Sequence, residues 1–97
     1  MITKEAEIFL KSMTFEQHRH RVEKAIIAVD KAKLYCFECA VRLANCVVDG
    51  HHAQIGAADA YRIARRELQR RKKRLKQLQC SMNTWMALKY NYQDVGA

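Results

Sequence analysis

Cationic side chains are concentrated in one short segment of this chain. The fifteen residues 62–76 hold nine lysines and arginines, and Glu67 is the one carboxylate among them. The first fifty residues, in contrast, are nearly balanced, with eight cationic and seven acidic side chains. Like charges crowded on a folded surface repel one another, so such a segment is typical of a surface that binds an anionic partner. Arginine is well suited to phosphate, whose oxygens it contacts at two points.

A helical wheel places these cations on one broad arc, at about 100° per residue. The arc is centred nearly opposite the apolar seam of its helix, and Arg71 alone falls within the seam. A solvated face is the alternative, but such faces usually interleave acidic residues four positions away, and these are nearly absent here. An arc along several turns suits phosphates of DNA or RNA, or an acidic protein surface. The predicted phosphate-binding residues are Arg62, Arg65, Arg66, Arg70, Lys72, Lys73, Arg74 and Lys76.

Cysteines and histidines suggest metal or redox chemistry less strongly. Cys36 and Cys39 form a C-x-x-C pair, and a third cysteine and two histidines follow within thirteen residues. Redox pairs of this spacing work at a helix N-terminus, whereas this pair falls in the middle of a predicted helix. Zinc needs four converging ligands, and Cys80 falls far from the pair in the predicted fold. We expect reduced, buried thiols that act as small apolar side chains, with no metal and no cofactor.

No arrangement typical of catalysis is present in the sequence. It has no glycine-rich phosphate loop, no nucleophile with an evident base, and no carboxylate pair on a common concave face. We therefore expect neither an enzyme nor a small-molecule substrate. The N-terminal residues include early acids and no long apolar run, which predicts a cytoplasmic protein without a secretory signal or a membrane span.

The elements that must position these residues are helices. Among 97 residues there are no prolines and three glycines, and 49% are apolar, so we predict one all-α domain over residues 1–97. Thr3 is placed to cap a short helix through about residue 11, and Thr14 with Gln17 forms a capping box for a long helix over 14–49. Gly50 suits the end of that helix. Residues 50–56 read as a connection, residues 57–90 as a second long basic helix, and residues 91–97 as a frayed end.

Both long helices have apolar residues at alternating spacings of four and three. In the first helix the predicted seam is Val22, Ile26, Val29, Lys33, Cys36, Ala40, Leu43 and Val47. In the second it is Ala57, Tyr61, Ala64, Leu68, Arg71, Leu75, Leu78 and Met82. Folding the chain back pairs residues whose numbers add to 104, which predicts a long antiparallel, coiled-coil-like helical hairpin. This register places His18 near Trp85. It also sets Lys33 against Arg71 in an unfavourable layer, in which either Asp30 and Glu67 screen the repulsion or the two side chains extend outward into solvent.

The first long helix has more apolar surface than one partner can cover. A row of small residues flanks its seam, at Ala25, Ala32, Cys39 and Cys46. One neighbouring helix covers a stripe of roughly 100°, so a second stripe is left for another subunit or another protein. The predicted partner interface is Ile27, Leu34, Phe37, Val41 and Val48. We expect a homodimer that forms a four-helix bundle.

Two kinds of function fit these patterns. The first is a small nucleic-acid-binding or regulatory accessory protein, of the kind encoded by phages or plasmids, that contacts the phosphate backbone through its basic helix. The second is an adaptor, chaperone or inhibitor that docks on an acidic partner surface through the apolar stripe and the basic helix. Backbone binding weakens steeply with salt, whereas a hydrophobic protein interface persists.

Overall fold

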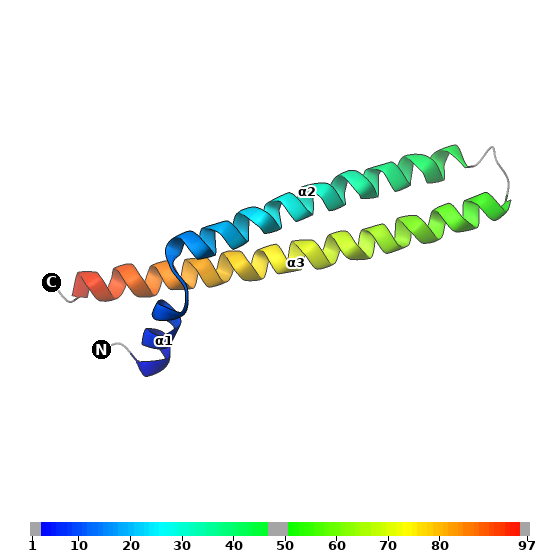
Figure 1. Cartoon of the computed structure of the whole chain (residues 1–97). Coiled ribbons are helices and arrows are strands. Elements are labelled where there is room, and N and C mark those ends of the chain that lie inside the picture. Colours follow the sequence, from blue (N-terminus) through cyan, green and yellow to red (C-terminus); the bar gives the residue numbers. More distant parts are fainter. Residues whose placement is uncertain (1–2, 47–50, 96–97) are drawn as a thin grey trace.

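The protein is a long helical hairpin with a short helix at its N-terminal end. A computed structural model describes the backbone of residues 3–46 and 51–95, and the side chains of residues 3–46 and 54–90. It contains α1 (Lys4–Ser12), α2 (Phe15–Asn45) and α3 (His51–Val95), and no strand within the described residues. The long helices α2 and α3 run antiparallel, and α1 packs against α3 near the start of α2 (Figure 1). The predicted all-helical fold with two long packed helices is confirmed.

The helices α1 and α2 both begin at the predicted capping residues. The Thr3 hydroxyl accepts a hydrogen bond from the Ala6 amide at 3.1 Å. At the start of α2, the Thr14 hydroxyl accepts from the Gln17 amide at 3.2 Å, and the Gln17 side chain accepts from the Thr14 amide at 2.8 Å. This reciprocal pair satisfies two amide groups that would otherwise lack partners, and such a cap contributes about 1 kcal/mol.

The helix α3 is longer than the sequence predicts at both ends. It begins at His51, so residues 51–56, which read as a connection, are helical. An interior glycine costs a helix only about 1 kcal/mol relative to alanine, and Gly56 is flanked here by residues that tolerate a helix. At the other end α3 continues to Val95, since no proline or glycine interrupts it after Tyr90. The predicted end of the first long helix, at residues 47–50, lies outside the described residues.

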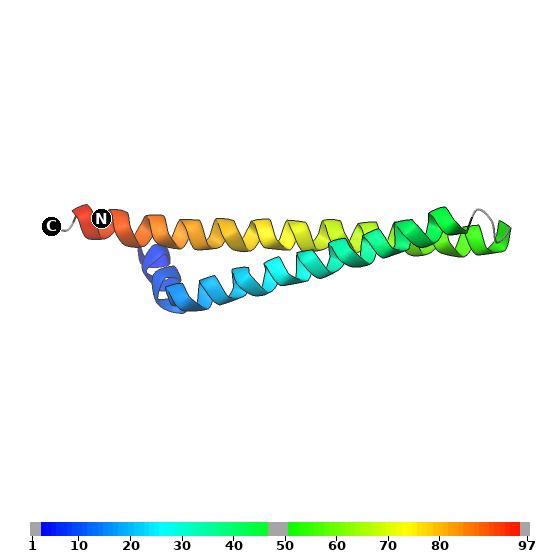
Figure 2. The same ribbon diagram turned by 90° about the horizontal axis from the view of Figure 1, so that it is seen from above.

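The hairpin is thin and extended. Its dimensions are 70 × 18 × 17 Å and its radius of gyration is 20.7 Å, whereas a compact domain of this length would have a radius of roughly 12–13 Å. Figure 2 shows α2 crossing α3 at a shallow angle. Each long helix therefore has one neighbour along most of its length, and much of its circumference is left uncovered.

The seam of α3 follows the predicted spacing. Three of its residues, Ala57, Ala64 and Leu78, are buried. The half-buried members are Tyr61, Leu68, Leu75 and Met82. Trp85 is also buried and extends the seam by one heptad position. Arg71 is the exception, because its side chain is exposed.

The seam of α2 is rotated from its predicted position. Ile26 and Lys33, which we expected inside, are exposed. Five other predicted members are buried or half-buried, namely Val22, Val29, Cys36, Ala40 and Leu43. The remaining buried or half-buried positions on this side are His18, Ala25, Ala32, Cys39 and Cys46. A seam with Ala25 and Ala32 and a seam with Ile26 and Lys33 both keep spacings of three and four between Val22, Val29 and Cys36. The observed seam has Ala25 and Ala32, which leaves the Lys33 ammonium in water, where its charge costs least. Lys33 and Arg71 are both exposed, so neither charge is buried between the helices.

A cluster of aromatic rings fastens α1 to the hairpin. The Trp85 indole N–H donates to the Leu10 carbonyl oxygen at 3.2 Å. His18, only 4% exposed, lies between two rings, with centroids 5.8 Å from Trp85 and 6.0 Å from Phe9. Burial lowers the pKa of His18, and the positive charge of Arg21 lowers this pKa further. The predicted neighbourhood of His18 and Trp85 is confirmed.

Candidate nucleic-acid interface

All eight predicted phosphate-binding side chains lie exposed on α3. They are Arg62, Arg65, Arg66, Arg70, Lys72, Lys73, Arg74 and Lys76. No glycine or proline occurs within this part of the helix, so its backbone is a continuous rod. From residue 62 to residue 76 the helix rises about 21 Å. The side chains are therefore presented to solvent from a rigid support about four turns long.

Two carboxylates neutralise part of this surface. Asp59 pairs with Arg62 at 3.4 Å, and Glu67 pairs with Arg70 at 3.4 Å and with Arg71 at 2.7 Å. The Asp59 pair was not anticipated, because Asp59 precedes the basic segment, although its spacing of three residues from Arg62 is a readable helical signal. All these pairs are solvent-exposed, so each contributes at most about 1 kcal/mol and competes weakly with an external anion.

Six of the predicted cations form no ion pair with any described residue. These are Arg65, Arg66, Lys72, Lys73, Arg74 and Lys76. They lie within twelve consecutive positions of α3, which span about 17 Å of helix. We define these six residues as the basic stripe. Since no described carboxylate pairs with it, solvent ions balance its positive charge, and an anionic polymer would displace them.

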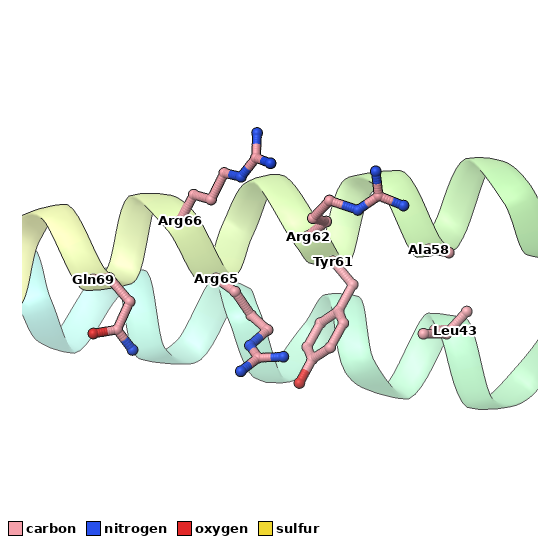
Figure 3. A pocket seen from close by; sticks show the side chains of 7 residues that line it. All are labelled: Leu43, Ala58, Tyr61, Arg62, Arg65, Arg66 and Gln69. Atoms are coloured by element: carbon pink, nitrogen blue, oxygen red, sulfur yellow. The ribbon is translucent and has the colours of Figure 1, made fainter.

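A shallow depression of about 530 Å³ lies beside one end of the basic stripe. It is lined by Leu43, Ala58, Tyr61, Arg62, Arg65, Arg66 and Gln69. Arg62 and Arg66 point away from α2, whereas Tyr61, Arg65 and Gln69 extend toward it (Figure 3). The Arg65 guanidinium lies 5.7 Å from the centre of the Tyr61 ring. In such an arrangement the guanidinium can contact a phosphate while the aromatic ring stacks on a base.

A second surface, on α2, is apolar and uncovered. Ile27 is 54% exposed, Leu34 60%, Phe37 66% and Val41 43%. We call these four residues the apolar stripe. Val48, the fifth predicted interface residue, lies outside the described residues. Neither α1 nor α3 covers the stripe, because the observed seam turns a different side of α2 toward α3.

The cysteines are all free thiols. Cys39 and Cys46 are buried and Cys36 is half-buried, as small apolar side chains of the seam would be. Cys80 is exposed, contrary to expectation, because it lies two residues beyond the buried Leu78 and hence on the outer side of α3. Nowhere in the described part of the chain do three or more potential metal ligands gather. No helix of that part combines the length and the apolar character that crossing a membrane requires.

Two surfaces of the hairpin are thus available to other molecules, namely the basic stripe of α3 and the apolar stripe of α2. They differ in chemistry, since one is suited to anions and the other to apolar side chains. Comparisons with protein-family models, with curated proteins and with solved structures give no match to this chain.

Proposed function

We propose that this protein binds DNA or RNA through the phosphate backbone, using the outer face of α3. The observation that supports this most is the basic stripe, six exposed cations within about 17 Å of helix and without a carboxylate partner among the described residues. Each phosphate that such a side chain neutralises releases condensed counterions, which drives binding at low salt.

Binding of this kind has low sequence specificity. Phosphate contacts fix the position of a protein on a nucleic acid but do not distinguish its bases. The Tyr61 ring beside Arg65 adds a platform for an unpaired base, and stacking of this kind tolerates every base. An accessory protein that coats or condenses a nucleic acid would need no more than this.

The proposed active form is a homodimer joined through the apolar stripe. Ile27, Leu34 and Val41 recur every seven residues on α2, which is the spacing of a helix that packs along another helix. Pairing α2 with α2 of a second copy would give a four-helix bundle, with each α3 on the outside. Both basic stripes would then remain free for a nucleic acid.

A second candidate function rests on the same exposed apolar stripe. An adaptor, chaperone or inhibitor would use the stripe to bind another protein, while α3 contacted an acidic patch of that partner. Such an interface depends mainly on apolar contact and so persists as salt rises. Nucleic-acid binding would fall steeply over the same range.

The test is direct binding of the purified protein to fluorescent duplex DNA, single-stranded DNA and hairpin RNA, by anisotropy at about 50 mM salt. We expect binding to at least one of them, and weaker binding by the triple variant Lys72→Gln, Lys73→Gln, Lys76→Gln. The matched control is Lys4→Gln, Lys11→Gln, Lys33→Gln, which removes the same charge from α1 and α2. Absence of binding to all three probes would refute the proposal. Purification from lysate with and without nuclease would then identify a protein partner.

A further inference from the structure

A groove between α2 and α3 is lined by cations from both helices. One depression, of about 370 Å³, contains Lys24, Lys31 and Arg71 in its wall. An adjoining depression of about 260 Å³ contains Arg21, Lys24, Arg71 and Arg74. The two share Lys24, Ala28 and Arg71, so they form one continuous groove. We call it the interhelical groove.

Small side chains give the interhelical groove its floor. Ala25, Ala28 and Ala32 line it from α2, and all three are half-buried. Because each contributes only a methyl group, the longer side chains of the neighbouring turns form walls around an open space. The alanine side chains of the floor form no hydrogen bonds, so polar contacts with a bound molecule would come from the side chains of the walls.

All the charged side chains of those walls are cationic, and the other large lining residues are Ile27 and Leu78. Arg21, Lys24 and Lys31 extend from α2, and Arg71 and Arg74 from α3. No carboxylate is among the lining residues of either depression. Glu67 pairs with Arg71 from the preceding turn of α3, and that pair is exposed. Five positive side chains facing one groove repel one another, so an anion between them would lower the free energy of the whole arrangement.

The length of the groove fits a polymer rather than a single ion. Arg21 and Lys31 are ten residues apart on α2, which corresponds to about 15 Å. One strand of a duplex has a phosphate roughly every 3.4 Å along the axis, and successive phosphates are farther apart along the strand itself, so at most about four phosphates span that distance. Four of the five cations form no ion pair with a described residue, whereas Arg71 pairs with Glu67, so these four are enough to neutralise the phosphates that the groove can hold. A free phosphate ion would leave most of these cations unneutralised.

We infer that the interhelical groove holds the phosphodiester backbone of one nucleic-acid strand. The phosphate-binding site would then span both helices and include Arg21, Lys24 and Lys31 of α2, in addition to the basic stripe. This inference rests on the proposed function and locates part of its contact surface. Binding would require the hairpin to be closed, because neither helix alone forms the groove.

The test compares two double variants of equal charge. Lys24→Gln with Lys31→Gln removes two groove lysines, and Lys4→Gln with Lys33→Gln removes two lysines elsewhere. All four are exposed and form no ion pair with a described residue. Lys33 lies two residues from Lys31, about 200° around the same helix. Lysine and glutamine have similar helix propensities, so each variant should keep the wild-type circular dichroism spectrum.

The measurement is the slope of log affinity against log salt for a fluorescent duplex DNA. We expect the groove variant to have a slope about 1.8 shallower than the wild type, since each lost phosphate contact removes about 0.9. The control variant should keep the wild-type slope, and Lys24→Arg with Lys31→Arg should restore it.

Equal slopes for the groove and control variants would overturn the inference. If the Lys72, Lys73 and Lys76 variant still weakened binding in that case, the proposed function would stand and only the groove would be wrong. A wild-type protein that bound no nucleic acid would refute both.

Discussion

Replacing Phe37 by glutamine should weaken self-association of the hairpin about a hundredfold. Phe37 is the most exposed large apolar side chain of α2, at 66%. It lies in the apolar stripe, through which we propose that two copies pack. Glutamine is a comparable helix former, so the change removes apolar contact surface without a large effect on α2 itself.

The magnitude follows from the exposed fraction. Complete burial of a large apolar side chain is worth about 1.5–3 kcal/mol. About two-thirds of Phe37 is available to be buried by a partner, which gives about 1.5 kcal/mol per copy and about 3 kcal/mol per symmetric dimer. Since about 1.4 kcal/mol corresponds to a factor of ten, the dimer Kd should rise about a hundredfold.

Sedimentation equilibrium over a range of protein concentrations measures this Kd. Tyr35→Gln is the matched control, because Tyr35 is an exposed aromatic residue on α2, at 54%, but lies about 200° around the helix from Phe37. We expect the control to dimerise like the wild type. A wild-type protein that stays monomeric at high micromolar concentration would contradict the dimer, and equal effects of the two substitutions would contradict the assigned face.

Three further predictions concern the cap, the buried histidine and the acid within the basic segment. Thr14→Ala should lower the free energy of unfolding by about 1 kcal/mol, because it removes the capping box of α2. The control Thr84→Ala, within α3, should not lower the free energy of unfolding. Urea denaturation measures both changes. Because burial and Arg21 lower the pKa of His18, the unfolded chain takes up a proton near pH 6.5 before the native state does. Stability should therefore fall as pH decreases through 6.5. His18→Leu should reduce this fall in urea midpoint, and substitution of the exposed His20 by glutamine should leave the His18 contribution intact. Glu67→Gln should strengthen binding to duplex DNA at low salt, because it frees Arg70 and Arg71 from their ion pairs. The control Glu38→Gln, on α2, should strengthen binding less. Equal gains in affinity for the two variants would count against α3 as the contact surface.

Local features of the fold could be predicted from the sequence, because they depend on neighbouring residues alone. The caps at Thr3 and Thr14 need only residues three positions away, and both form. The α3 seam was readable because its larger apolar residues follow one spacing. The start of α3 at His51 was not, since Gly56 is compatible with both a loop and a helix.

The side of α2 that faces α3 could not be read from spacing alone. Val22 and Val29 belong to both possible seams, and the choice between Ala25 and Ile26 depends on what α3 presents. A hydrophobicity pattern favours the larger Ile26, whereas the structure turns Ala25 inward and leaves Lys33 in solvent. That choice exposes more apolar surface on α2 than one hairpin can cover.

The candidate site was predictable only in part, for the same reason. The basic segment of α3 is contiguous in sequence, so its exposed cations could be named in advance. The interhelical groove is lined by two residues of this basic segment, Arg71 and Arg74, and also by Lys24 and Lys31, which come from a segment of balanced charge. Only the pairing of the two helices brings these lysines beside Arg71 and Arg74.

The salt dependence of wild-type binding to duplex DNA tests the central claim most directly. If the exposed cations of the hairpin contact at least four phosphates, log affinity should fall against log salt with a slope of about −3.6 or steeper. A slope near zero, or no binding at low salt, would contradict a phosphate-binding function for this surface.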